Sequence, residues 1–176
     1  MSAGMHSLRT AGFTGLLGGS MAALGYVHTG MLAAVPAGTG LAVLAFSDLR
    51  TRRFSLSTLR ASSILVAVGL VVDSSRAAAW DRLVVATLVT AIVGAAVGGA
   101  WLGTRGIAFG DVLLTTFSVA VPAWLSPRAA ATTLLVGLLA SLVMVLAERR
   151  VADRGSPGVA LGPALLAGWA VAMVVG

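Results

Sequence analysis

Hydrophobic residues form long uninterrupted runs along this chain, and short polar segments rich in arginine separate the runs. The first run, Ala11–Ser47, contains no Asp, Glu, Lys or Arg over 37 residues. As one helix it would extend roughly 55 Å. Because the hydrocarbon core of a bilayer is only about 30 Å thick, the run is expected to hold two spans. Tyr26–Gly30 is the predicted turn between them, since Tyr and His suit the membrane interface.

The later runs predict five more spans, because each approaches the roughly 20 residues that cross a bilayer. A polar loop, Asp73–Arg82, separates the third span from the fourth, and Ser126-Pro127-Arg128 separates the fifth from the sixth. The predicted fold class is all-α, a polytopic transmembrane helix bundle formed by residues 1–176 as a single domain. The seven expected spans are about 10–28, 30–48, 54–72, 83–103, 106–125, 129–147 and 158–176.

A competing interpretation concerns the first run. Arg9, the hydrophobic stretch after it and Ser20-Met21-Ala22 match the layout of a secretory signal peptide with its cleavage site. The hydrophobic run continues well past that site, which favours a retained span. If the first span were absent or cleaved, six spans would remain with the same orientation.

Composition supports the membrane interpretation. The chain is 58% hydrophobic and 10% charged, with a mean hydropathy of +0.99, whereas soluble domains carry about 25% charged residues. All twelve basic residues are Arg and lie between hydrophobic runs, where they indicate topology rather than a nucleic-acid-binding face. We therefore expect a lipid bilayer around the chain and no nucleic acid as partner. The chain has no Cys, which excludes disulfides and thiolate metal sites.

The distribution of arginine between the two sets of span ends predicts the orientation. One set holds nine arginines and the other holds only Arg76, Arg82 and Arg128. By the positive-inside rule the first set is cytoplasmic. On the outer side, Asp73 and Asp81 are expected to share a formally neutral loop with two arginines. The nine predicted cytoplasmic arginines are Arg9, Arg50, Arg52, Arg53, Arg60, Arg105, Arg149, Arg150 and Arg154.

Two carboxylates interrupt the hydrophobic pattern at the edges of spans. Asp111 begins a run that contains no other charge before Arg128. Counting back a full span starts this helix near Gly106, so Asp111 is expected more than one turn inside the membrane. An ionised carboxylate there is costly unless it faces water or a partner, which makes it a functional candidate. Asp48, at the end of the second span, is the best partner for it.

Three segments together resemble the type IV prepilin peptidases, which are bacterial membrane aspartic peptidases of the GxGD type. The first is Asp48–Leu56, an Asp before an Arg-rich turn, and the second is Gly106–Leu114, which contains Phe-Gly-Asp-Val. The third is Ser156–Leu165, whose Gly-Pro is similar to a landmark in the family's final span. The resemblance implies catalytic roles for Asp48 and Asp111.

The same resemblance implies a function: cleavage of the short basic leader of a pilin-like precursor protein. The enzyme would lie in a bacterial plasma membrane with its active site facing the cytoplasm. Two carboxylates at low dielectric share one proton, so one can activate water while the other protonates the scissile carbonyl. This chemistry needs no metal and no cofactor. Since the chain has no Cys, it resembles the short cleavage-only form, without the Cys-rich insert associated with N-methylation.

Three small or restricted residues beside these motifs are candidates for the substrate groove. Gly110 leaves the backbone next to Asp111 uncovered, so an extended peptide can approach it. Pro163 removes a backbone donor and can disturb its helix. An opened helix at membrane depth must face protein or a water cavity, which a peptidase needs. Gly162 precedes this proline and completes the predicted groove.

Several positions depart from the family pattern. Ala108 stands where GxGD has its first Gly, Leu113 where Lys is usual, and Phe54-Ser55-Leu56 where Ile-Pro-Asn is usual. None of these changes removes a carboxylate, so they bear on substrate range more than on chemistry. Pro163-Ala164-Leu165 also matches the PAL tripeptide of the presenilin-like proteases. That group is much larger and has a different first motif, so it ranks below the prepilin peptidases.

A non-enzymatic interpretation stays open beside these. In a membrane scaffold or a small proton-coupled transporter, the same two Asp residues would serve structure or proton binding. Asp48 would then be an interfacial residue paired with the arginines that follow it. Asp111 would be a carboxylate at a helix N-terminus, where the helix dipole favours it.

Overall fold

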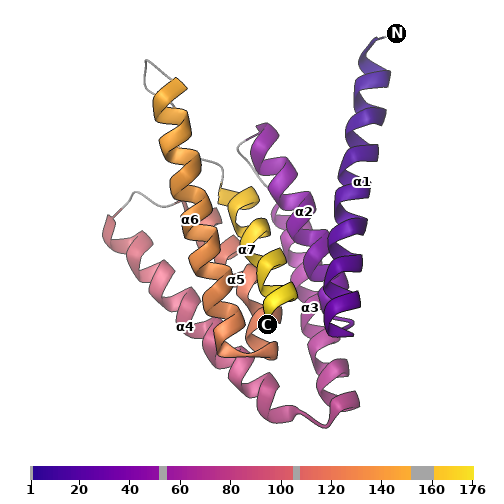
Figure 1. Cartoon of the computed structure of the whole chain (residues 1–176), viewed down its shortest axis with the longest axis vertical. Helices are drawn as coiled ribbons and strands as arrows, with labels where there is room; N and C mark the ends of the chain where they lie inside the picture. Colours follow the sequence, from indigo (N-terminus) through magenta and orange to yellow (C-terminus); the bar gives the residue numbers. More distant parts are fainter. Residues whose placement is uncertain (1, 52–54, 105–107, 152–160) are drawn as a thin grey trace.

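The computed structural model describes residues 2–51, 55–104, 108–151 and 161–176, and nearly all of this part is α-helical (Figure 1). The fold is an all-α helical bundle, as the hydrophobic pattern predicts. Arg52, Arg53, Arg105, Arg154 and the Ser156–Ala160 part of the third motif lie outside the described residues. The helices are α1 (Ser2–Thr29), α2 (Ala34–Thr51), α3 (Leu56–Ala77), α4 (Trp80–Thr104), α5 (Phe109–Leu125), α6 (Pro127–Val151) and α7 (Leu161–Val175).

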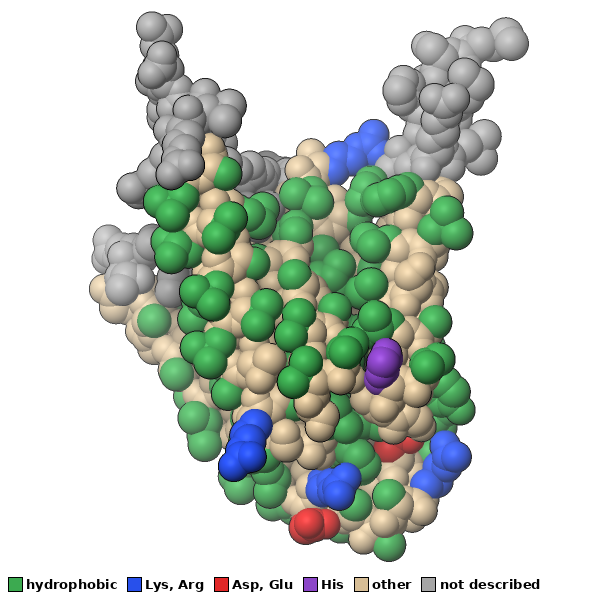
Figure 2. All heavy atoms as spheres, viewed as in Figure 1, with side chains coloured by type: hydrophobic (Ala, Val, Ile, Leu, Met, Phe, Trp, Pro, Cys, Tyr) green, Lys and Arg blue, Asp and Glu red, His purple; other side chains and the backbone are tan. Residues whose placement is uncertain are grey.

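Successive helices run in opposite directions, so their termini gather at two ends of the bundle (Figure 1). One end, which we call the Asp48 end, holds the C-termini of α2 and α4 and the N-termini of α3, α5 and α7. The other, which we call the Trp124 end, holds the α3–α4 and α5–α6 turns. Figure 2 shows hydrophobic side chains covering the middle of one face, with charged side chains near the two ends.

Helix length and composition identify a membrane protein. Three segments of the described chain are long and apolar enough to cross a bilayer: Leu56–Ala77, Trp80–Gly103 and Pro127–Ala147. Helices α5 and α7 are apolar but shorter, with 17 and 15 residues. Because a full span takes roughly 20 residues, the count of seven spans and their orientation stay predictions.

Helix α2 is central, since it packs against α1, α3, α5 and α7. Its buried face consists largely of alanine, including Ala34, Ala37 and Ala42, each at most 1% exposed. Small residues let neighbouring helices approach closely, which is how helices associate in lipid without a hydrophobic driving force. At Gly38 the approach is so close that a Cβ would lie 2.8 Å from the backbone of Met21 in α1. This packing fixes α2, and with it Asp48, among four neighbours.

The connection between α3 and α4 differs from the sequence prediction. Helix α3 continues to Ala77 and α4 begins at Trp80, so residues 73–82 are mostly helical. Asp73, expected in a solvated loop, is only 5% exposed. Its carboxylate accepts hydrogen bonds from the backbone N–H groups of Leu32 (3.1 Å) and Ala33 (2.9 Å). The prediction for Asp73 is wrong because its partners lie 40 residues away, where a local pattern cannot reveal them.

These contacts fasten the Trp124 end of the bundle. The two N–H groups that donate to Asp73 belong to residues just before α2. No preceding helical turn supplies carbonyl acceptors for these N–H groups. Beside them, the indole Nε1 of Trp124 donates to the hydroxyl of Ser74 at 2.8 Å. The Arg82 guanidinium lies 5.3 Å from the Trp124 ring, a cation–π distance. Asp73 and Ser74 therefore join α3 to the start of α2 and the end of α5.

Candidate active site

Asp48 lies in the last turn of α2, at the place predicted for it, and is half-buried. Its Oδ2 accepts a hydrogen bond of 2.9 Å from the backbone N–H of Gly162, which lies 114 residues away at the start of α7. The first N–H groups of a helix have no acceptor within the helix. The positive end of the helix dipole also favours an anion there. Asp48 therefore joins α2 to the N-terminus of α7.

Gly162 allows this contact because it has no side chain. It is buried, and a Cβ at its position would lie 2.8 Å from Ala45 Cα and 3.2 Å from Asp48 Oδ2. Such distances are shorter than ordinary carbon–carbon contacts of about 3.5–4.0 Å. Glycine at this position therefore lets α7 meet α2 closely enough for its N–H to reach the carboxylate.

Pro163 lies in the first turn of α7 rather than well inside the span. N–H groups in the first turn of a helix have no acceptor within that helix. A proline in this turn, which has no N–H, therefore removes no hydrogen bond of the helix. The expectation that Pro163 disturbs its helix stays a prediction, since the residues directly before Leu161 lie outside the described part of the chain.

Asp111 is the third residue of α5, which begins at Phe109 rather than near Gly106. The expected helix start near Gly106 is therefore wrong, and Asp111 lies in the first turn of the helix; its depth in the membrane stays a prediction. Its Oδ2 accepts a hydrogen bond of 3.3 Å from the backbone N–H of Ala108, which precedes the helix in an extended conformation. This contact satisfies a donor at the helix start, where the dipole favours a carboxylate. Asp111 is half-buried.

The structure brings these sequence-distant residues to one place. Helices α2 and α5 pack against each other, as do α2 and α7 and α5 and α7. Asp48 lies in the last turn of α2 and Asp111 in the first turn of α5, and Gly162 donates a hydrogen bond to Asp48. Two carboxylates and one helix N-terminus therefore lie at the Asp48 end of the bundle.

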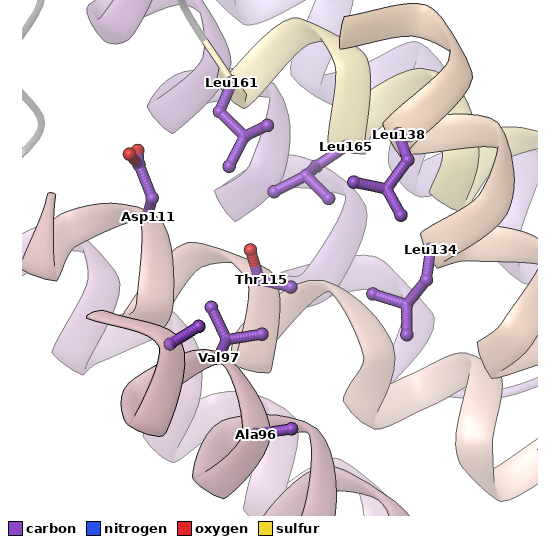
Figure 3. Close-up of a pocket in the computed structure, with 10 residues that line it drawn as sticks. Ala96, Val97, Asp111, Thr115, Leu134, Leu138, Leu161 and Leu165 are labelled. Carbon is purple, nitrogen blue, oxygen red and sulfur yellow. The ribbon is translucent and has the colours of Figure 1, made fainter. Parts of the chain in front are cut away.

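A cavity of about 490 Å³ opens beside Asp111 between α4, α5, α6 and α7. Figure 3 shows Asp111 at one side of the cavity, with leucines from α6 and α7 on the other sides. Its walls are apolar apart from two side chains, Asp111 and Thr115, which lie one turn apart on α5. The lining residues are Ala96, Val97, Ala100, Asp111, Thr115, Leu134, Gly137, Leu138, Leu161 and Leu165.

The predicted groove residues lie next to this cavity rather than in its wall. Gly110, Gly162 and Pro163 are not among the described residues that line it. Gly110 precedes Asp111, and Gly162 follows Leu161, so two of the three adjoin a lining residue. Thr115 is a lining residue that sequence reasoning missed, because one threonine in an apolar run is common in membrane helices and gives no signal of its own.

The positions that depart from the family pattern have local structural roles. Ala108 supplies the N–H that Asp111 accepts. Ser55 caps α3, since its hydroxyl accepts a hydrogen bond from the backbone N–H of Thr58 at 3.3 Å. Leu113 is half-buried and packs against the hydrophobic core. These substitutions thus fit the helices around both carboxylates and leave the carboxylates in place.

Comparison of the chain with protein-family models, with curated proteins and with solved structures gave no match. In the described part of the chain, no group of three or more His, Cys, Asp or Glu side chains is placed to hold a metal ion. What the site offers is two carboxyl groups at the same end of the bundle, each held by a backbone N–H, with an apolar cavity beside Asp111. Such a pair can exchange protons with water or a bound substrate.

Proposed function

We propose that this protein is a membrane-embedded aspartic endopeptidase of the prepilin peptidase type. Its substrate would be a pilin-like precursor protein, cut on the cytoplasmic side between a short basic leader and a hydrophobic helix. The observation that carries the proposal is that the packing of α2, α5 and α7 places Asp48, Asp111 and Gly162 at one end of the bundle, with Gly162 hydrogen-bonded to Asp48. The motif resemblance rests on these same residues, although they lie far apart in the sequence.

The arrangement of the carboxyl groups suits peptide hydrolysis. Each is held through Oδ2 by a backbone N–H, which leaves Oδ1 as the oxygen to face water or substrate. In the proposed reaction the ionised Asp takes a proton from water as the water oxygen attacks the scissile carbonyl carbon. The protonated Asp donates its proton to the carbonyl oxygen. The tetrahedral intermediate then collapses, the C–N bond breaks, and the nitrogen leaves with a proton from the pair.

Removal of either carboxyl group tests the proposal. Asp48→Ala, Asp111→Ala and the double variant should lose cleavage to nearly the same extent, because residues that act as one unit are strongly non-additive. Asp48→Asn and Asp111→Asn should fail too, since an amide cannot take up the proton of water. The measurement is the mobility shift of a co-expressed pilin-like precursor, with the amount of each variant checked in membranes. A well-expressed Asp111→Asn variant that still cleaves would overturn the peptidase proposal.

The non-enzymatic alternative has an observation of its own in its favour. Both carboxylates accept hydrogen bonds from backbone groups at helix N-termini, as a scaffold or a proton-coupled transporter could also require. Asp48→Asn separates a scaffold from the peptidase, because the amide oxygen of Asn can still accept the N–H of Gly162 but an amide cannot take up a proton. A scaffold should tolerate this change, whereas a peptidase should lose its activity.

A further inference from the structure

The cavity beside Asp111 opens through the side of the bundle, between α4 and α6. Leu138, which lines it from α6, is 65% exposed. Ala96 and Ala100, which line it from α4, are exposed as well. Helix α4 is apolar and very few of its residues are buried. This side of the bundle would therefore face lipid. The cavity therefore joins the surroundings of Asp111 to the hydrocarbon region of the membrane.

The α4 side of this opening consists of small residues. Gly94 lies against Thr116 of α5, and Gly98 lies against Val112 of the same helix. One face of α4 therefore packs against α5. On the neighbouring face, a Cβ at Gly99 or Gly103 would meet nothing within 4 Å. Together with Ala96 and Ala100, these glycines form a face on which another helix can approach closely.

Thr115 is the uncharged polar side chain in the wall of the cavity. Its side chain is only 7% exposed, and Figure 3 shows its hydroxyl directed into the cavity toward α7. Among the described residues no hydrogen bond is formed by this hydroxyl, whereas that of the adjacent Thr116 donates to the carbonyl of Val112 at 2.7 Å. The hydroxyl of Thr115 faces the cavity rather than a protein acceptor, so it is placed to donate a hydrogen bond to a molecule bound there.

We infer that the hydrophobic helix of the substrate enters laterally between α4 and α6, and that Thr115 binds a backbone carbonyl of its unwound end. This inference rests on the proposed peptidase function and adds the access route and a substrate-positioning residue. One turn of an α-helix occupies roughly 400–600 Å³, which matches the cavity of about 490 Å³. The carbonyls freed when that turn unwinds need donors in an apolar surrounding, and Thr115 supplies one beside Asp111. The hydrocarbon part of a lipid acyl chain carries no hydrogen-bond acceptor.

Crosslinking tests the access route, because the chain contains no Cys. The probe is a test precursor with a short Lys/Arg leader and an apolar helix of about 20 residues that carries one Cys near its start. In an Asp111→Asn background, which should retain uncleaved precursor, Ala100→Cys should crosslink to this probe. Ala61→Cys, on an exposed position of α3 near the same end of the bundle, is the matched control and should not crosslink.

Kinetics with the same precursor test Thr115. Thr115→Val removes the hydroxyl but keeps the shape, and should raise KM with little change in kcat, lowering kcat/KM about three- to tenfold. Thr115→Ser should restore it. Thr116→Val is the control, since that hydroxyl already has a partner within its helix, and its kcat/KM should stay near wild type. If Thr115 had only a structural role, Thr115→Val would not raise KM selectively, and Thr115→Ser would not restore kcat/KM.

The outcomes separate this inference from the proposed function. Selective crosslinking at Ala100 and selective loss at Thr115 support it. If the wild-type protein cleaves the precursor, but Ala100→Cys and Ala61→Cys crosslink equally or Thr115→Val is fully active, lateral access with Thr115 as positioning residue is wrong and the peptidase stands. If Ala100→Cys captures a lipid analogue rather than the precursor helix, the inferred occupant is wrong. If the wild-type protein does not cleave the precursor, both proposals fail.

Discussion

The contact between Gly162 and Asp48 gives a prediction with a magnitude that follows from the structure. In Gly162→Ala, the new methyl group would lie 2.8 Å from Ala45 Cα and 3.2 Å from Asp48 Oδ2. Ordinary contact requires α7 and α2 to separate by roughly 0.7–1.2 Å. Overpacking of this kind costs about 1–3 kcal/mol, and weakening the hydrogen bond to the half-buried carboxylate adds to it. We expect a loss of about 2–4 kcal/mol in the free energy of unfolding.

Activity should fall further than stability alone explains. A displacement near 1 Å at a catalytic group lowers rates about a hundredfold, so precursor cleavage should drop by about that factor in the protein that remains folded. The assays are denaturant unfolding in detergent and cleavage of the precursor in membranes. Gly19→Ala in α1 is the matched control, because a Cβ at Gly19 meets nothing within 4 Å. Equal stability and equal activity of the two variants would refute the argument from close approach.

Three further predictions concern other parts of the bundle. Asp73→Ala should lower the free energy of unfolding by about 2–3 kcal/mol, because two backbone N–H groups lose their acceptor, and denaturant unfolding measures it. Trp124→Phe should cost about 1 kcal/mol in the same assay through loss of the hydrogen bond to Ser74. Ser57→Cys, exposed at the Asp48 end, should react only with a thiol reagent supplied from the cytoplasmic side. Labelling from outside would contradict the predicted orientation.

The hydrophobic pattern alone was sufficient to predict the all-α bundle and the approximate position of every helix. The reason is that the bilayer allows few choices, since a long apolar run must be helical when its backbone groups have no water to bond. The turn at Ser126 is an example: α5 ends at Leu125 and α6 begins at Pro127, as the Ser-Pro signal predicts. Boundaries with weaker signals were less accurate, and α5 begins at Phe109 rather than near Gly106.

The sequence also singled out Asp48, Asp111 and Gly162, through charge in apolar surroundings and through motif resemblance. It could not predict that Gly162 donates to Asp48, or that Asp73 is buried against the start of α2. Those contacts join residues that are 114 and about 40 positions apart. Hydropathy records only whether a residue is apolar, and it assigns an exposed and a buried carboxylate the same value.

Thr115 shows the limit most clearly, because the adjacent Thr116 has the same residue type and nearly the same local sequence. On one helix, neighbouring residues project about 100° apart, so the two hydroxyls face different surroundings. One donates to its own helix at 2.7 Å, and the other is directed into the cavity. The sequence determined which segments form helices and which carry charge. Only the packing of α4, α6 and α7 around α5 decided which hydroxyl faces a cavity, because that depends on the rotation of each helix against its neighbours.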